Sequence, residues 1–267
     1  MKRELGREVT DGIPLVPVKV RELAPGVSWI IGCIAVGHGD TLIHSHASAY
    51  LLTGEHHSAL IDTGYPRHWP ELDTILDELL GDRGLDYIIP THPEIPHAGL
   101  VRQLIDKYPD SVVAGDVRDY HAYFGIPEER LRAVPEGEVL DLGGLRLEVA
   151  DAVILDLPAT VWLFEHTTRT LFVADAFAYA HKHADGECHL LSSELPDQPT
   201  AEQIGFVTSR ALYWTMFAEL EPLFARLDAS LEHFDPAVIA PAHGSVIDDP
   251  AAILPHIKAG MREVSRL

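Results

Sequence analysis

The sequence predicts an α/β fold in which two mixed β-sheets pack together and helices cover their outer faces. Three observations lead to this fold class. The first third of the chain has the apolar and alternating runs of β-strands. From Trp69 onward, helical periodicity alternates with short apolar strands, which indicates a partly parallel sheet. The second half returns to strands before it ends in helices.

The first third is predicted to be β because its apolar runs are short and are separated by residues that favour turns. Pro25-Gly26 is one such turn. The predicted strands cover residues 16–20, 27–36, 49–52 and 59–61, and the other turns cover 37–40 and 54–57.

From Trp69 the period of the apolar residues becomes helical. Leucine or isoleucine recurs at positions 72, 75, 76, 79 and 80, and Gly81 follows where a helix would end. A buried strand at 87–90, a helix around Leu100 to Ile105 and a strand at 112–114 come next. This β-α-β-α order favours parallel pairing.

The second half predicts three strands, a loop and two helices. The strands cover 145–149, 161–164 and 170–173, and the segment 181–200 reads as a long loop. A helix over 209–232 precedes a strand at 237–240 and a last helix. Three aromatic residues at helical spacing are expected in the core, namely Tyr213, Trp214 and Phe217.

Length and charge limit the classes of function. No linker or repeat divides the 267 residues, so we expect one domain over 1–267. The formal charge of −21 disfavours nucleic acid and membrane surfaces as partners. The start of the chain has no apolar run, and the apolar stretch 29–36 is too short to span a bilayer, so we expect a cytoplasmic protein.

Histidine is abundant, with 16 residues, and it is a frequent metal ligand. The two cysteines, Cys33 and Cys188, lack the spacing of a thiolate zinc site and are interpreted as ordinary buried thiols. Four histidines lie in or beside predicted turns and are expected to be solvated, namely His44, His46, His56 and His57.

Three segments place metal-binding residue types after strands. The stretch THPEIPH brings His92, Glu94 and His97 within six residues, at a sheet edge where ligands commonly bind. Asp175 ends one apolar strand, and His243 ends another. Each signal has a simpler interpretation, because histidines in loops are often solvated and an aspartate after a strand often caps a helix.

Taken together and in order, the segments LIDTG, THPEIPH, LDLPATVWLF, LFVADAF and APAHG resemble the metallo-β-lactamase superfamily over nearly the whole chain. The resemblance implies an αββα sandwich. Glu94 replaces the second histidine of the usual family loop, as it does in the flavodiiron proteins and related stand-alone di-iron proteins. The chain is therefore most similar to that branch.

Carried over by position, the resemblance implies a first metal at His92, Glu94, Asp156 and Asp175. It implies a second metal at His97, Asp175 and His243. Pro96 stands where the second metal's own carboxylate belongs, so this site is short of one ligand.

Two further residues are expected beside the ligands. Asp62 would orient a ligand, because metal-bound imidazoles usually have a hydrogen-bonded partner behind them. His181 follows the Asp175 strand, and it would contact the substrate or a ligand.

The oxygen-rich ligand set suits two iron ions, with manganese or zinc as alternatives. We expect dioxygen binding or activation, or redox chemistry on a small substrate. No FMN domain is expected after His243, so a separate electron donor would be needed. The alternatives are a hydrolase of esters, thioesters or lactones that uses a metal-bound hydroxide, and a degraded, non-catalytic site. The sequence is compatible with a homodimer but does not determine the oligomeric state.

Overall fold

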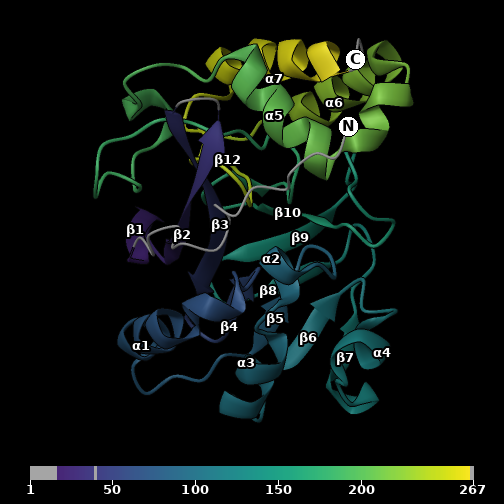
Figure 1. Cartoon of the computed structure of the whole chain (residues 1–267). Coiled ribbons are helices and arrows are strands. Elements are labelled where there is room, and N and C mark those ends of the chain that lie inside the picture. The colour runs from purple at the N-terminus through teal and green to yellow at the C-terminus, as the bar shows by residue number, and fades with distance from the viewer. Residues whose placement is uncertain (1–16, 39–40, 265–267) are drawn as a thin grey trace, which may run out of the picture.

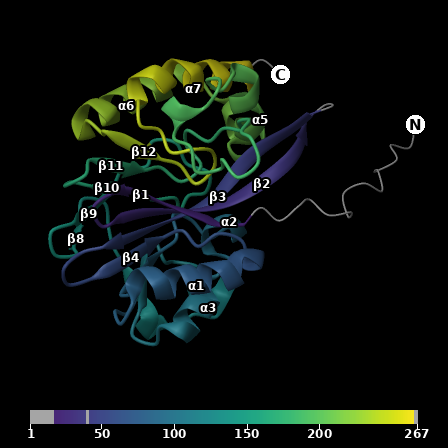
Figure 2. The ribbon, with the colours of Figure 1, turned by 90° about the vertical axis from the view of Figure 1, so that its left-hand side faces the viewer.

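The computed structural model describes residues 17–38 and 41–264. It contains a seven-stranded and a five-stranded β-sheet packed against each other, with helices on both outer faces. Figure 2 shows the layers edge on, with α5, α6 and α7 on one side of the sheets and α1 and α3 on the other. The predicted αββα sandwich is confirmed.

The first sheet has the order β1 to β7. Its first four strands form an antiparallel meander, and β4, β5, β6 and β7 pair in parallel, with α1 and α3 in the connections. The strands are β1 (Lys19–Ala24), β2 (Val27–His38), β3 (Thr41–Thr53), β4 (Ser58–Ile61), β5 (Tyr87–Ile89), β6 (Val112–Gly115) and β7 (Leu131–Ala133).

The second sheet has the order β12-β11-β10-β9-β8. Only its β11 and β12 pair in parallel, and the other pairs are antiparallel. The strands are β8 (Val139–Asp141), β9 (Arg146–Ala150), β10 (Trp162–Glu165), β11 (Thr170–Phe172) and β12 (Val238–Ala240).

The helices form where one face of a periodic segment can be buried. In α1, leucines 72, 76 and 80 are buried, and the helix ends at Gly81 with φ of 58°. The α-helices are α1 (Trp69–Leu80), α2 (Ile95–Ala98), α3 (Val101–Lys107), α4 (Tyr120–Phe124), α5 (Ala201–Ala211), α6 (Leu220–Phe234) and α7 (Pro250–Val264), and the short 3₁₀ helices are η2 (Pro66–His68), η3 (Glu128–Arg130), η4 (Ser192–Glu194) and η5 (Tyr213–Phe217).

Three apolar layers hold the elements together. Between the sheets, Trp29 and Phe172 belong to one buried cluster. Outside the five-stranded sheet, Phe224 and Ile257 come from its helices, and outside the seven-stranded sheet Leu76 is part of a third cluster. Burial of apolar surface on both faces of each sheet keeps the strand ends in fixed positions.

The parallel strands bring four chain segments to one edge of the sandwich. The segments after β4, β5, β11 and β12 all leave a sheet at the carboxyl end of a strand, where ligands commonly bind in α/β structures. Main-chain hydrogen bonds connect them to their neighbours. The Ala242 N–H donates to the Ala174 oxygen at 2.8 Å, and the Val161 N–H donates to the Thr91 oxygen at 2.8 Å.

Most predicted elements are confirmed, and two strand predictions have wrong bounds. The first observed strand begins at Lys19 rather than 16, and residue 16 lies outside the described residues. The third strand is much longer than predicted, because its first half carries polar residues such as His44 and His46 that break the apolar pattern. The elements α4, β7 and β8 are too short to give a periodic signal.

The predicted long helix over 209–232 is wrong. Helix α5 ends before Leu212, whose φ and ψ are −114° and 41°, and Glu219 is extended before α6 begins. The three aromatic residues that were expected in the core lie in η5 between them. Phe217 is 84% exposed and Tyr213 is 59% exposed, so neither is in the core.

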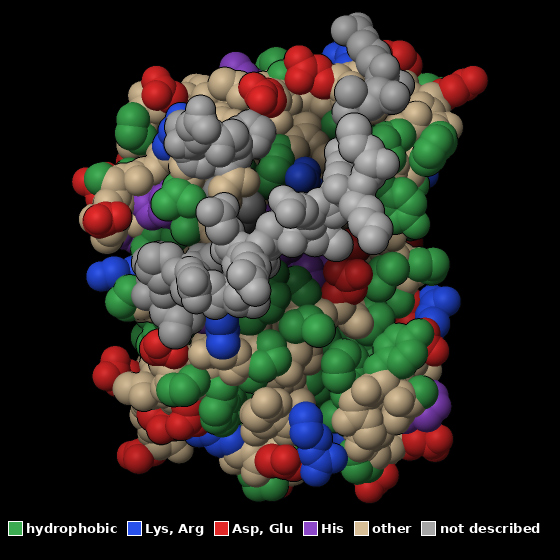
Figure 3. All heavy atoms as spheres, viewed as in Figure 1, with side chains coloured by type: hydrophobic (Ala, Val, Ile, Leu, Met, Phe, Trp, Pro, Cys, Tyr) green, Lys and Arg blue, Asp and Glu red, His purple; other side chains and the backbone are tan. Residues whose placement is uncertain are grey.

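The surface in Figure 3 has Lys and Arg side chains scattered among Asp and Glu side chains. Among the described residues on this face, Lys and Arg therefore form no clustered basic patch of the kind that phosphate backbones need. Within residues 17–38 and 41–264, no helix combines the length and the apolar character needed to cross a bilayer.

One buried carboxylate holds the β10–β11 turn. Glu165 is fully buried and accepts hydrogen bonds from the main-chain N–H of Arg146, Thr167 and Thr168 and from the Thr168 hydroxyl, at 2.6–3.0 Å. Burial opposes its ionisation, but these hydrogen bonds outweigh burial and lower the pKa of Glu165 below its ordinary value of 4.5.

We predict that Glu165→Gln lowers the free energy of unfolding by about 2 kcal/mol near neutral pH, because an amide replaces a charged acceptor. A lowered carboxyl pKa stabilises the fold above 4.5, and this contribution is lost as the pH falls through the folded-state pKa. The difference between wild type and variant in urea unfolding should therefore narrow in acid. The exposed Glu129→Gln is the control. A difference in unfolding free energy between wild type and Glu165→Gln that stays constant with pH would contradict the lowered pKa of Glu165.

Candidate metal centre

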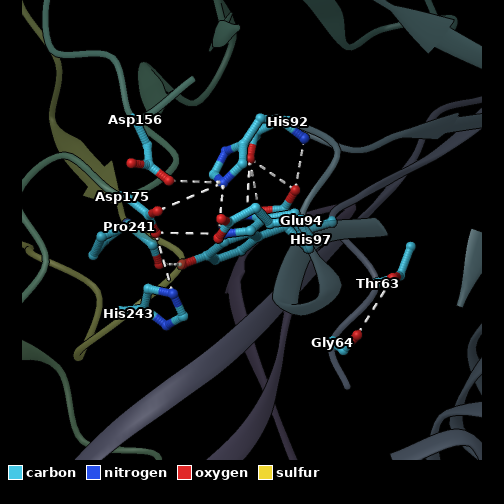
Figure 4. Close-up of polar contacts among 12 residues, drawn as sticks. Thr63, Gly64, His92, Glu94, His97, Asp156, Asp175, Pro241 and His243 are labelled. Carbon is cyan, nitrogen blue, oxygen red and sulfur yellow. Dashed lines mark hydrogen bonds and ion pairs between the residues drawn. The ribbon is translucent and has the colours of Figure 1, made fainter. Parts of the chain in front are cut away.

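The six predicted ligand side chains lie together at the edge of the sandwich (Figure 4). They come from four regions of the chain: the β5–α2 segment, the β9–β10 loop, the turn after β11 and the turn after β12. The residues are His92, Glu94, His97, Asp156, Asp175 and His243.

One group surrounds His92. Its Nε2 lies 3.6 Å from Asp156 Oδ2, 3.6 Å from Asp175 Oδ2 and 3.9 Å from Glu94 Oε2. The potential ligand atoms of these four residues all lie within 4.8 Å of one another. Two ligands that each lie about 2.0–2.2 Å from a shared ion are about 3–3.5 Å apart, so this spacing is close to that of a metal site.

A second group meets the other oxygen of the same carboxylate. His97 Nε2 lies 3.4 Å from Asp175 Oδ1, and His243 Nε2 lies 3.1 Å from that atom. Asp175 therefore faces His92 with Oδ2 and the other two histidines with Oδ1. A carboxylate that presents one oxygen to each of two groups has the geometry of a bridge.

Several polar atoms in the centre have no hydrogen-bond partner. They are buried, and a buried polar group without a partner costs about 1–3 kcal/mol. These atoms are His92 Nδ1 and Nε2, His97 Nε2 and Asp175 Oδ1. Three of them, His92 Nε2, His97 Nε2 and Asp175 Oδ1, are also the atoms that face across the two groups. Cations between these donors would satisfy them, so the residues fit a metal centre.

Asp62 holds His97 from behind. The His97 Nδ1–H donates to Asp62 Oδ2 at 2.9 Å, while Asp62 Oδ1 accepts the Thr91 N–H at 2.7 Å. Asp62 has φ of 56°, and Gly64 in the same turn has φ of 76°. Left-handed backbone at a non-glycine residue costs free energy and is concentrated at functional sites. The Asp-Thr-Gly turn accepts this strain and turns the carboxylate toward His97.

The turns that carry Asp175 and His243 are fixed in a similar way. Ala174 has φ of 51° directly before Asp175. The Tyr50 hydroxyl donates to the Pro241 oxygen at 2.6 Å, and the His243 Nδ1–H donates to the main-chain oxygen of His46. This leaves His243 Nε2 directed toward Asp175.

The electrostatics favour a cation. Burial and repulsion from Asp175 and Glu94 raise the pKa of Asp156 to about 7. Burial opposes charge on His97, but Asp62 and Asp175 outweigh it and raise the pKa of His97 well above its usual value. The electrostatic potential at the centre is therefore negative enough to raise the proton affinity of both side chains, and metal cations would take the place of these protons.

The centre opens toward solvent on one side. The Glu94 side chain is 50% exposed, whereas those of His92 and His97 are fully buried. A cavity of about 330 Å³ lies beside the centre, lined by Pro93 and Leu157 among others. Because these residues directly follow His92 and Asp156, a small molecule in the cavity would lie close to the first group.

Two nearby residues escaped the sequence analysis. Thr91 donates its hydroxyl to Asp62 and precedes His92, so its position in the motif was an available signal. Tyr65 follows the Asp62 turn, and burial together with the charges of Asp175 and Glu94 raises the pKa of its phenol despite the opposing effect of Arg67. No spacing rule marks such a residue.

The predicted solvated histidines need correction. His56 and His57 are exposed, but His46 is fully buried and His44 is half-buried. His181, expected beside the ligands, packs against His46 with ring centroids 4.8 Å apart. The first half of β3 packs against the segment after β11 and does not form a solvated turn. The predicted burial of Cys33 and Cys188 is confirmed.

Comparison with known proteins gives consistent relatives. Residues 43–243 match the family described as the metallo-beta-lactamase superfamily. The coenzyme F420H2 oxidase of Methanothermobacter marburgensis is 29% identical over 237 residues, which are 81% of this chain and 54% of that protein. The chain thus spans about half the length of this relative.

Two solved structures share the fold. The rubredoxin oxygen:oxidoreductase of Desulfovibrio gigas has a TM-score of 0.71 at 19% identity, over 92% of this chain and 61% of that one. A variant of the flavo di-iron protein of Thermotoga maritima has a TM-score of 0.72 at 13% identity, over 94% and 62%. Since the family match covers most of the chain, the protein belongs to the metallo-β-lactamase superfamily.

Proposed function

We propose that the chain holds a non-haem di-iron centre and uses it to bind or reduce dioxygen with electrons from a separate donor. His92, Glu94, Asp156 and Asp175 would hold the first ion. His97, His243 and the other oxygen of Asp175 would hold the second. The observation that carries the proposal is the convergence of unpartnered buried nitrogens from both groups, His92 Nε2 and His97 Nε2, on the two oxygens of Asp175.

The ligand types support iron rather than zinc. The first group has one imidazole and three carboxylates, and hard oxygen donors suit iron or manganese better than a zinc site built on histidine and cysteine. Bound iron would supply one-electron redox chemistry. The relatives named as an oxidase and as an oxygen:oxidoreductase favour the same class of reaction.

The second site has preorganised histidines, although Pro96 supplies no carboxylate to it. Its two histidines each donate Nδ1–H to a fixed acceptor, Asp62 for His97 and the His46 oxygen for His243. Such partners fix the ring and its tautomer, and they raise the basicity of the other nitrogen. Preorganised imidazoles would partly offset the carboxylate that is missing at Pro96.

The chain's own residues would control access and protons. Glu94, as the exposed ligand, lies where a small molecule would arrive, and the buried histidines exclude water from the far side. Asp156 would release its proton when the metal binds, because its pKa of about 7 belongs to a carboxyl without a cation.

Electrons would come from a reduced carrier. The names of the relatives mention coenzyme F420H2 and rubredoxin, and we infer a donor of comparable redox role for this chain. That residues 1–267 form a single domain remains a prediction.

The first prediction from this proposal concerns the ligand set. After anaerobic loading with ferrous iron, Glu94→Ala and Asp156→Ala should each lower the iron content of the chain, and Asp175→Asn should lower it most because Asp175 serves both ions. Metal analysis of the desalted protein measures this. The exposed Asp110→Ala is the control, and unchanged iron in both Glu94→Ala and Asp156→Ala would remove these two residues from the site.

The second prediction concerns Asp62. Asp62→Asn keeps an oxygen for the Thr91 N–H but removes the charge that faces His97. We expect binding of the second iron to weaken by about 10–100-fold, with the first little changed. A titration followed by the visible spectrum separates the two steps, and equal weakening of both ions would contradict a specific role at His97.

The third prediction tests the reaction class. Iron-loaded protein should bleach on anaerobic reduction and regain its colour on addition of oxygen, with oxygen consumption that is lost in Asp175→Asn. Turnover of a simple ester by the zinc-loaded form, without any response of the iron form to oxygen, would favour the hydrolase instead. Pro96 argues against that outcome because it lacks the carboxylate that normally helps to position the nucleophile.

A further inference from the structure

A second cluster of metal-binding side chains lies where the β2–β3 hairpin meets the segment after β11. It contains Cys33 on β2, His44 and His46 on β3, and His181 and His183 in the following loop. Main-chain pairing fixes its position, because the His44 N–H donates to the His181 oxygen at 2.7 Å and the His181 N–H donates back at 2.9 Å. The long hairpin that carries it is visible in Figure 2.

The segments around the cluster are packed rather than loose. Ile43 on the hairpin, Ala178 and Ala180 after β11, and Val207 on α5 form one buried apolar cluster. The histidines therefore project from backbone that tertiary contacts hold in place, as a preorganised site requires.

Three imidazoles offer nitrogen atoms to a common point. One ligand atom each from His46, His181 and His183 lies within 4.8 Å of the other two. The ring centroids of His46 and His181 are 4.8 Å apart, and those of His181 and His183 are 5.3 Å apart. This spacing suits donors around one ion rather than stacked rings, because the planes of His46 and His181 meet at 74°.

Two ring nitrogens of the cluster are buried without a hydrogen-bond partner. They are Nε2 of His46, which is fully buried, and Nδ1 of His181, which is 2% exposed. An imidazole nitrogen that is removed from water and left unbonded destabilises the fold by about 1–3 kcal/mol. A bound cation would remove this penalty.

In His46 and His183 the other ring nitrogen is held as in metal-binding histidines. His46 Nδ1 lies 2.8 Å from the Gly244 oxygen, and His183 Nδ1 lies 2.7 Å from the Ala184 oxygen. A carbonyl oxygen only accepts, so Nδ1 carries the proton in both rings and Nε2 presents its lone pair. Hydrogen bonds of this kind, made by the ring nitrogen that does not bind the metal, orient metal-bound imidazoles in proteins.

The neutral form of imidazole is the one that binds metal. Burial, together with the neighbouring imidazoles, lowers the pKa of His181 well below its usual value. Burial and His183 lower the pKa of His44 as well. The cluster thus differs from the carboxylate-rich centre in both charge and ligand type.

Cys33 borders the cluster as a thiol. Its Sγ lies 3.4 Å from His183 Nε2 and 3.5 Å from His44 Nδ1. A hydrogen bond with Cys188 and burial both raise the pKa of Cys33, so the thiolate form is disfavoured. The three imidazoles are therefore the better ligands.

We propose that His46 Nε2, His181 Nδ1 and His183 Nε2 form a site for a divalent transition-metal ion of the zinc type, separate from the di-iron centre. Neutral nitrogen donors suit zinc and cobalt(II), whereas iron prefers the oxygen-rich set. The ion would tie β3 to the segment after β11. The proposal does not depend on the redox function, because it uses none of the six residues assigned to the iron centre.

The test uses the full chain with the first centre disabled by His92→Gln and Asp175→Asn. Zinc alone is titrated by calorimetry, and unfolding is followed with and without zinc. We expect one zinc ion per chain to bind to this double variant and to raise its melting temperature. Adding His183→Gln should weaken zinc binding at least about 100-fold, because it removes a direct ligand. The exposed His256→Gln is the matched control.

His183 is only half-buried, so its replacement should leave the fold intact, and circular dichroism verifies this. Absence of zinc binding in the double variant, or equal binding with and without His183→Gln, would overturn the proposal. Cobalt(II) gives a second measurement. Its visible bands should appear without a thiolate charge-transfer band, and such a band would overturn the three-imidazole assignment in favour of Cys33. Failure of the di-iron proposal would instead appear as iron content that does not respond to Asp175→Asn.

Discussion

The buried carboxylate of Asp175 is the feature on which the rest of the centre depends. It is 2% exposed and faces His92 with one oxygen and His97 and His243 with the other. A carboxylate in such surroundings is costly unless cationic partners accompany it. Protonated imidazoles lower the pKa of Asp175 well below its usual value despite its burial, and metal ions would act in the same direction.

The fold supports this carboxylate by concentrating strain at the edge where parallel strands end. Asp62, Ala174 and Phe177 all have positive φ, between 51° and 61°. Each left-handed residue destabilises the fold, and the packing of the two sheets offsets this cost, because a sandwich buried on both faces does not relax easily. Main-chain hydrogen bonds between the turns, such as Ala242 to Ala174, then hold the side chains in register.

The carboxylate-rich centre and the imidazole cluster lie close together but share no side chain. The main-chain oxygen of His46 accepts from His243 Nδ1, while the His46 side chain faces His181 on the other side. One strand therefore contributes its backbone to the oxygen-rich centre and its side chain to the imidazole cluster. Ligand type separates the two, because carboxylates gather around Asp175 and the second cluster offers imidazoles and the Cys33 thiol. Different metals would consequently favour different sites.

The sequence alone determined the two-sheet architecture and most strands and helices, because periodicity is a local property. The six residues that meet at the centre followed from the resemblance of five short motifs, in their order along the chain, to the metallo-β-lactamase superfamily. The sequence did not show that helix α5 ends before Leu212 or that Phe217 is exposed, since both depend on packing between distant segments. Only the tertiary structure decided that His46 is buried beside His181. Their rings meet because β3 pairs with a segment more than a hundred residues away, and no local pattern records such a contact.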